Sequence, residues 1–163
     1  MREVDPKTLK ENVFRLFDDR WTLITAGTPE KYNTMTASWG GLGVLWNRPV
    51  ATVYIRPQRY TCSFVGQSGY FTLSFLSEDR RDALAFCGSH SGRDVDKFAA
   101  CGLHAAFEGE APYVAESELV LVCRKRYWND LDPLAMDRDA LDHYKDCDYH
   151  RMYIGEIVKV LVK

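Results

Sequence analysis

Short apolar stretches alternate with polar breaks along most of this chain. β-Branched and aromatic residues dominate the stretches, and Gly, Pro and Asn separate them, which is typical of strands joined by turns. Strands are expected at residues 21–26, 34–39, 41–46, 50–55, 70–76, 118–128 and 151–162. About six to eight such strands predict a mainly β fold with short helices, most simply a partly open antiparallel barrel.

Helical spacing of apolar residues occurs only in short segments. Asp5 and Pro6 fit an N-cap followed by proline at the first helical position, so a helix is expected from there to about Phe17. Further helices are expected near residues 61–65, 78–87, 94–100 and 139–144, with Thr61 and Asp94 as N-caps and Gly102 after the third. The surrounding segment, residues 129–149, is polar and acidic.

The composition excludes several classes of function. The 163 residues carry a formal net charge of -2, and the densest basic run, residues 124–126, follows an apolar strand, so no general nucleic-acid surface is expected. Residues 1–11 do not resemble a signal peptide, and no stretch is apolar enough to span a membrane. Five scattered cysteines indicate reduced thiols in a cytoplasmic protein. Without repeats or a visible boundary, residues 1–163 are expected to form a single domain.

Two segments set arginines beside small hydroxyl or glycine residues where a strand gives way to a helix. They are Arg56-Pro57-Gln58-Arg59-Tyr60-Thr61 and Ser91-Gly92-Arg93-Asp94. Guanidinium groups and the free N–H groups of a helix start are suited to binding a phosphate. Each segment also has a purely structural interpretation, in which the arginines are solvated, a hydroxyl or carboxylate caps a helix, and Arg93 and Lys97 lie on an exposed face.

The segment Asn33-Thr34-Met35-Thr36-Ala37-Ser38-Trp39 alternates hydroxyl and apolar side chains. In a strand, Thr34, Thr36 and Ser38 would share one face, and the apolar residues would share the other. A row of hydroxyls can hydrogen-bond the polar edge of a ring or a polyol chain. The alternative is a strand whose hydroxyl face meets solvent, with Asn33 in a turn.

Other patterns indicate less chemistry. Residues 40–43, Gly-Gly-Leu-Gly, lack the third glycine of a dinucleotide fingerprint and a surrounding βαβ unit, so they favour a strand bend. His143, Cys147 and His150 have a spacing that could ligate zinc, but a fourth ligand is missing nearby, and no metal site is expected. His90 and His104 are expected at the surface, and no nucleophile motif is present.

The order of these motifs is similar to that of a known family. Asn33-x-Met35-Thr36-x-Ser38-Trp39 is followed by Arg56-Pro57-x-Arg59-Tyr60-Thr61 and then by Ser91-Gly92-Arg93-Asp94-x-Asp96-Lys97-Phe98, and residues 153–157 match a closing strand. Together they resemble the flavin reductase-like family of FMN-binding split-barrel proteins, which includes flavoredoxin. The resemblance extends from about Trp21 to Val162 and is weakest over residues 129–149, whose role it leaves open.

The resemblance implies an FMN-binding split β-barrel that forms a homodimer with the flavin near the subunit interface. It assigns residues 33–39 to the isoalloxazine and ribityl parts of FMN, and the two arginine segments to the ribityl chain and the phosphate. The cofactor-binding residues that it implies are Asn33, Thr34, Met35, Thr36, Ala37, Ser38, Trp39, Arg56, Pro57, Arg59, Tyr60, Thr61, Ser91, Gly92, Arg93 and Lys97. The last four could come from the partner subunit.

Two functions follow from this resemblance. The first is NAD(P)H-dependent reduction of FMN, or of another acceptor through bound FMN, with NADH or NADPH as donor. The second is a flavoredoxin-like carrier that passes electrons between protein partners. Chemistry at flavin N5 needs no dedicated acid–base residue, so no catalytic residue is assigned. A third interpretation is a barrel that binds another phosphorylated ligand without redox chemistry.

Overall fold

The computed structural model describes the whole chain, residues 1–163. Eight strands form one antiparallel sheet in the order β3-β2-β6-β9-β10-β5-β4, with β1 paired to the C-terminal end of β10. These strands are β1 (Arg2–Val4), β2 (Thr22–Gly27), β3 (Tyr32–Ala37), β4 (Gly40–Leu45), β5 (Arg48–Ile55), β6 (Tyr70–Phe75), β9 (Leu119–Asp130) and β10 (Arg151–Val162). A separate hairpin joins β7 (Ala105–Glu108) to β8 (Ala111–Val114). The predicted mainly β fold with short helices is confirmed.

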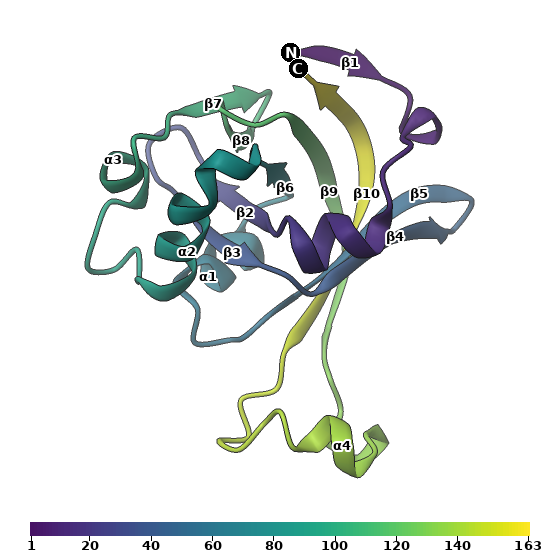
Figure 1. Cartoon of the computed structure of the whole chain (residues 1–163). Coiled ribbons are helices and arrows are strands. Elements are labelled where there is room, and N and C mark those ends of the chain that lie inside the picture. Colours follow the sequence, from purple (N-terminus) through teal and green to yellow (C-terminus); the bar gives the residue numbers. More distant parts are fainter.

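The helices are short and lie between strands. They are α1 (Tyr60–Gln67), α2 (Arg81–Ser89), α3 (Lys97–Cys101) and α4 (Arg138–Leu141), with 3-10 turns at Pro6–Thr8, Glu78–Arg80 and Pro133–Ala135 and a π-helical turn at Arg15–Asp19. No helix combines the length and the apolar character that crossing a bilayer requires. α1, α2 and α3 gather beside β2 and β3 (Figure 1), with α1 packed in the main core and α2 and α3 in a second cluster.

β2 is buried on both faces, because the sheet curls around one core while helices pack against its outer side. Ile24 faces the main core together with Phe71 and Tyr153, and none of the three has exposed surface. Leu23 points the opposite way and packs in a second cluster with Leu84 of α2. Alternate residues of one strand therefore serve two cores, and the second core holds α2 against β2 and β3.

β9 and β10 run beyond the barrel as an arm that ends in α4 (Figure 1). Gly155 lies where β10 passes the core, and a Cβ there would be 2.6 Å from Phe71 Cζ and 2.7 Å from Cys123 Cβ. This close approach requires glycine. The pairing of β10 with β9 shifts register between Ile154 and Gly155, which lets the strands bend from the barrel into the arm.

Glu156 follows this bend and binds arginines from the two neighbouring strands. Its carboxylate pairs with Arg48 of β5, with Arg124 of β9 at 2.8 Å and with Arg126 of β9 at 3.8 Å. The Glu156 side chain is 9% exposed. Hydrogen bonds from Arg124 and then from Arg48 hold the pKa of the Glu156 carboxyl below its ordinary value. This carboxylate therefore ties three strands together beside the bend.

The predicted N-terminal helix is wrong in its extent. Asp5 does cap a turn, but this turn ends at Thr8, and the chain is extended at Leu9, where ψ is 129°. The helical turn at Arg15–Asp19 forms separately. β1, β7 and β8 are additional to the predicted strands, and each has at most four residues, too few for an alternating pattern to stand out.

Two predicted helix caps also need correction. α1 has Arg59 at its N-cap, and Thr61 lies inside the helix, where its buried hydroxyl accepts a hydrogen bond from Asn33 Nδ2 at 2.8 Å. α3 begins after Asp96, whose carboxylate accepts from two N–H groups of the first turn, so Asp94 is not the cap. In both cases the helix starts close to the predicted place, but a different residue occupies its N-cap.

We expect Glu156→Gln to lower the free energy of unfolding by about 1–2 kcal/mol at pH 7, because it removes the charge that faces three arginines. The folded pKa lies below the unfolded one, so this stabilisation is complete above about pH 5 and is lost as the pH falls through the folded pKa. Urea unfolding of both proteins at pH 7 and at pH 3 measures it. A difference between the proteins that stays the same at pH 3 would contradict the explanation.

Candidate functional site

A cavity of about 250 Å³ opens where β3 ends. It is lined by Met35, Thr36, Ala37, Ser38, Trp39, Tyr54, Arg56, Arg59 and His150. The fold therefore brings most of the predicted residues of the 33–39 strand to both arginines of the 56–61 segment. The motifs did not indicate Tyr54 as a lining residue, and His150 was considered only as a zinc ligand.

The hydroxyl face of β3 is partly covered by α2, and burial decreases along it from Thr34 to Thr36 and Ser38. Thr34 is fully buried, and its hydroxyl lies 3.0 Å from that of Thr25. Thr36 donates its hydroxyl proton to the Leu84 carbonyl at the end of the cavity nearest α2. Of the three hydroxyls predicted to face a ligand, Thr34 is therefore part of the interior, and Thr36 and Ser38 line the cavity. The alternative of a solvent-facing strand side is therefore wrong for Thr34, and the contact of Thr36 and Ser38 with a ligand stays a prediction.

Arg59 and Lys97 both bind the carbonyl end of α2. The Arg59 guanidinium donates to the carbonyls of Gly88 at 2.7 Å and Cys87 at 3.3 Å. Lys97 Nζ donates to the carbonyls of Cys87 at 2.8 Å and Thr34 at 2.9 Å. Cations are favoured beside the free carbonyls of a helix C-terminus. Lys97 is only 3% exposed, so the interpretation that placed it on an exposed face is wrong.

These cations have no acidic partner. Arg59, Lys97 and Arg93 take part in none of the ion pairs of the chain. Burial, and then the charge of Arg59, lower the pKa of Lys97 to about 8, and burial also lowers the pKa of Arg59. Because like charges meet here without compensation, an anion bound nearby would be stabilised.

A second cavity, of about 460 Å³, contains most of the other predicted residues. Asn33, Tyr60, Gly92, Arg93 and Lys97 are among those that line it. Arg93 donates to the Gln58 carbonyl at 3.1 Å, and its guanidinium lies 4.7 Å from the centre of the Tyr60 ring. A Cβ on Gly92 would lie 2.0 Å from Asn33 Oδ1, so only glycine lets this loop approach β3 so closely. The two arginine segments thus meet within one chain.

Four predicted residues line neither cavity: Thr34, Pro57, Thr61 and Ser91. Pro57 is exposed in the turn before α1 and lines neither cavity. Ser91 accepts a hydrogen bond from the backbone N–H of Arg93 at 3.2 Å and so shapes its loop. His90 and His104 are exposed, as predicted. Contact of Pro57 or Ser91 with a ligand stays a prediction.

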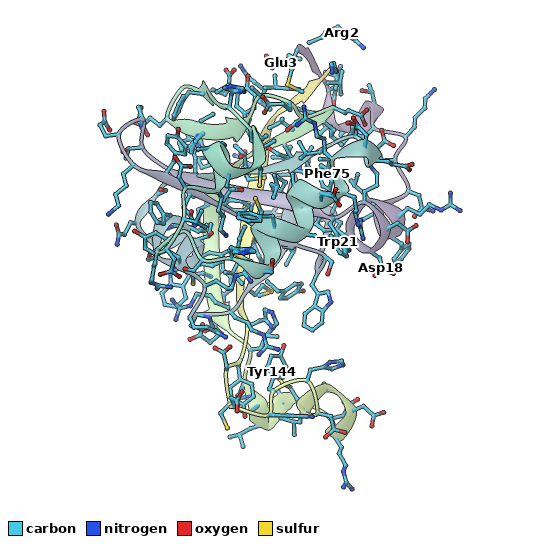
Figure 2. All side chains as sticks on the ribbon, turned by 60° about the vertical axis from the view of Figure 1, so that its left-hand side comes forward. Arg2, Glu3, Asp18, Trp21, Phe75 and Tyr144 are labelled. Atoms are coloured by element: carbon cyan, nitrogen blue, oxygen red, sulfur yellow. The ribbon has the colours of Figure 1, made fainter.

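The arm closes the outer side of the first cavity through Arg56. One Arg56 nitrogen donates to the His143 carbonyl at 3.0 Å, and another lies 3.3 Å from Asp148 Oδ2. The guanidinium also lies over the ring of Tyr144, 5.4 Å from its centre. Figure 2 shows Tyr144 on the arm below the barrel, beside α4. The segment of unknown role, residues 129–149, therefore holds Arg56 in place at the edge of the candidate site.

His150 lines the first cavity itself. Its Nδ1 lies 2.9 Å from the Tyr144 hydroxyl, and its ring centre lies 4.9 Å from that of Trp39. Burial, and then the charge of Arg56, lower the pKa of His150 to about 4. The imidazole is therefore neutral at pH 7. The described residues contain no group of three metal-ligating side chains, so the His143–Cys147–His150 spacing does not assemble one.

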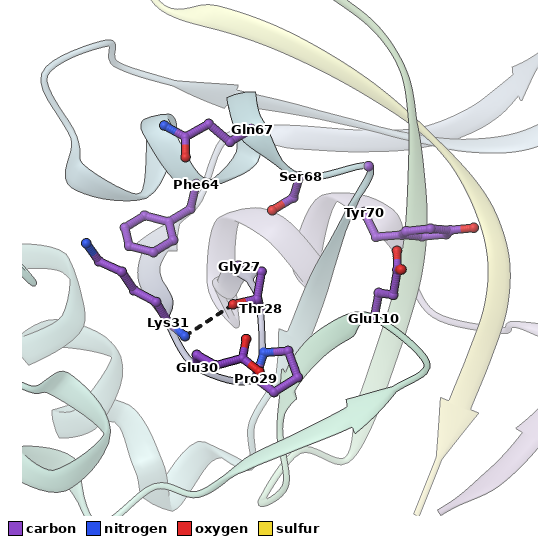
Figure 3. A pocket seen from close by; sticks show the side chains of 11 residues that line it. Gly27, Thr28, Pro29, Glu30, Lys31, Phe64, Gln67, Ser68, Tyr70 and Glu110 are labelled. Carbon is purple, nitrogen blue, oxygen red and sulfur yellow. Dashed lines mark hydrogen bonds between the residues drawn. The ribbon is translucent and has the colours of Figure 1, made fainter.

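A larger cavity, of about 680 Å³, lies at the other end of β3 (Figure 3). The turn of residues 27–31 and the end of α1 line it, together with Tyr70 and Glu110. Thr28 accepts a hydrogen bond from the N–H of Lys31 there. None of the predicted site residues reaches this cavity, and its charged side chains are Glu30, Glu110 and Lys31. With more carboxylates than cations, it is poorly suited to a phosphate.

Comparisons with known proteins identify the family and the fold of the chain. A family model described as a flavin reductase like domain matches residues 14–163. The search of curated proteins finds no match. Flavoredoxin from Methanosarcina acetivorans superposes with a TM-score of 0.72 at 21% sequence identity, over 100% of this chain and 75% of that chain.

Two further solved structures have the same architecture. An FMN-binding protein from Thermus thermophilus with bound 1-cyclohex-2-enone gives a TM-score of 0.71 at 20% identity, over 99% of this chain and 80% of that chain. A flavin reductase-like protein with a split barrel domain from Shewanella frigidimarina gives 0.70 at 20% identity, over 98% and 75%. The predicted split-barrel fold is confirmed, and the chain belongs to the flavin reductase-like domain family.

Proposed function

We propose that this chain binds FMN and works as a flavoprotein oxidoreductase, with NADH or NADPH as the electron donor and flavin or another compound as the acceptor. The observation that carries the proposal is the group of Arg59, Arg93 and Lys97, which lie on adjoining cavities and form no ion pair. A phosphate would supply the missing negative charge. Because the chain belongs to the flavin reductase-like family, we propose FMN as the phosphate-bearing ligand.

The edge position of β3 supports placing the flavin ring at the first cavity. β3 is the outermost strand of the sheet and pairs only with β2, so the backbone groups along its outer edge have no strand partner. Lys97 donates a hydrogen bond to the Thr34 carbonyl of β3. The backbone beyond it, through Ser38 and Trp39, remains available to the polar edge of a flavin ring at the first cavity.

Bound FMN would supply hydride and single-electron transfer, and the chain would bind it, orient it and exclude water. Trp39, 44% exposed, lies at the cavity beside His150. When Tyr144 donates its hydroxyl proton to Nδ1 of His150, the imidazole proton is on Nε2, and this N–H can be donated to a ligand. His150 is therefore the side chain best placed to fix the orientation of a bound ring or acceptor.

An electron carrier of the flavoredoxin kind is the second candidate. The exposed indoles of Trp39 and Trp128, 44% and 50% exposed, favour it, because aromatic side chains at a surface are typical of docking sites for protein partners. The Arg151 guanidinium lies over Trp128, 4.4 Å from its ring centre.

A cytoplasmic location is part of both proposals, and the five cysteines are free thiols.

We expect the double substitution Arg59→Gln and Arg93→Gln to weaken FMN binding about 100-fold, because each charge-assisted contact to the phosphate is worth about a factor of ten. Flavin fluorescence titration measures the affinity. Riboflavin lacks the phosphate, so its affinity should change little, and Arg138→Gln in α4 serves as a matched control. An FMN affinity equal to that of the wild type would contradict the phosphate assignment.

Anaerobic addition of NADH or NADPH to the FMN-loaded protein distinguishes the two functions. For a reductase, we expect one nucleotide to bleach the visible flavin absorption within minutes. For a carrier, neither nucleotide should bleach it, whereas dithionite should. A protein that takes up no FMN would contradict both proposals.

A homodimer belongs to the same proposal. Val44, Leu45 and Trp46 are exposed on β4 and its turn, with 77%, 37% and 53% of their surface accessible, and β4 is the other edge strand of the sheet. Such an apolar edge is typical of a surface that a partner covers.

Light scattering should therefore give the mass of two chains. Val44→Glu should shift this mass toward one chain, because it places a charge in the apolar edge. Val158→Glu on β10, where the side chain is also exposed, is the matched control and should leave the dimer intact. A single-chain mass for the unaltered protein would exclude the homodimer.

A further inference from the structure

Two thiols from different helices meet beneath the loop that carries Arg93. The Sγ atoms of Cys87 in α2 and Cys101 in α3 are 4.0 Å apart. Cys87 is fully buried and Cys101 is partly exposed, so one thiol of the pair can be reached from solvent. The other three cysteines contact no second thiol, so this is the single dithiol of the chain.

We propose that Cys87 and Cys101 are a redox-active pair that a hydroperoxide converts reversibly into a disulfide. A disulfide has an S–S length of about 2 Å, so the sulfurs must approach by about another 2 Å. Cys101 is the last residue of the short helix α3, and Gly102 follows it with φ of 60°. The Cys101 thiol donates a hydrogen bond to the Ala83 carbonyl of α2 at 3.9 Å. Its side chain is hydrogen-bonded to no strand or helix other than α2. A small shift of the C-terminal end of α3 toward α2, with Lys97 at its other end kept in place, would close the distance.

The partly exposed thiol is the one that meets the oxidant. Cys101, as its thiolate, attacks the hydroperoxide: an S–O bond forms, the O–O bond breaks, and water or an alcohol leaves with the former thiol proton. Cys87 then attacks the Cys101 sulfur of this sulfenic acid: the S–S bond forms, the S–O bond breaks, and a second water leaves with the Cys87 proton. The two thiols together lose two electrons, and the hydroperoxide gains them.

The buried position of Cys87 fits the second step. Burial, and then the neighbouring Cys101, raise the pKa of the Cys87 thiol to about 12, so it stays protonated at neutral pH. A protonated, enclosed thiol does not react with an oxidant in solution. The one sulfur within its reach is that of Cys101, which it attacks as the thiolate once its proton has been lost, so its enclosure favours an internal disulfide.

The disulfide would close a loop over residues 88–100. This loop carries Ser91, Gly92, Arg93 and Lys97, and the Cys87 carbonyl at its start accepts hydrogen bonds from Lys97 and Arg59. The cross-link thus joins both ends of the segment that binds the phosphate of FMN, a consequence that rests on the proposed function. Because a cross-link restricts the loop, the oxidised protein should release FMN more slowly.

The test uses the full chain with Cys147→Ser, since Cys147 is exposed and would form bonds between chains. After hydrogen peroxide treatment and unfolding in denaturant, two of the four remaining thiols should be lost, and peptide mass mapping should show Cys87 joined to Cys101. Dithiothreitol should restore both. When Cys101→Ser or Cys101→Ala is added to this protein, the peroxide treatment should remove no pair of thiols. Retention of all four thiols, or Cys101 oxidised alone beside a free Cys87, would overturn the proposal.

FMN dissociation, followed by fluorescence, tests the consequence in the same protein. We expect the oxidised form to release FMN about threefold more slowly, and the Cys101→Ser protein to show no difference between treatments. Equal rates with a mapped disulfide would overturn the coupling to FMN. If neither form binds FMN, the proposed function fails, while the mass mapping still decides whether the disulfide forms.

Discussion

The buried ammonium of Lys97 is the interaction on which the candidate site depends. It lies 3% exposed between the carbonyls of Thr34 in β3 and Cys87 in α2, with no carboxylate bound to it. Removing a charge from water in this way is costly, and the pKa of Lys97 falls to about 8 as a result. Two carbonyl dipoles, one of them at a helix C-terminus, offset that cost. Because the same contact joins α2, α3 and β3, the wall of the site is fixed before any ligand arrives.

The distribution of charge in this protein matters more than its total. A formal net charge of -2 gives no indication of an anion site. The structure shows that several carboxylates are already engaged elsewhere: Glu156 binds arginines on β5 and β9, and Asp130 binds Arg151. The cations at the end of α2 are left without such partners. A local excess of positive charge therefore arises inside an acidic chain, and only the packing of α2 and α3 on β3 creates it.

The sequence predicted the parts of the site better than their contacts. Strand positions followed from the alternation of apolar residues, and glycine at 92 and arginine at 59 and 93 were found as motifs because their chemistry is local. Lys97 was expected to bind a ligand or lie on the surface, and its burial depends on contacts with residues 10 and 63 positions away. The wall made by His150 could not be predicted, because it requires the arm to fold back on Arg56. Spacing alone suggested zinc there, whereas the neighbours of His150 are Tyr144 and Trp39.

The two arginines of the Arg56–Thr61 segment differ in what binding a phosphate would require of them. Arg59 and Arg93 donate hydrogen bonds only to backbone carbonyls, so a phosphate adds a charged partner and displaces no carboxylate. Arg56 already faces Asp148 at 3.3 Å, stacks over Tyr144 and donates to the arm at His143. Moving Arg56 to a phosphate would leave Asp148 without its partner and release the arm from the cavity. Arg56 is therefore better suited to holding the arm in place than to binding phosphate, and the arm in turn holds His150 against Trp39.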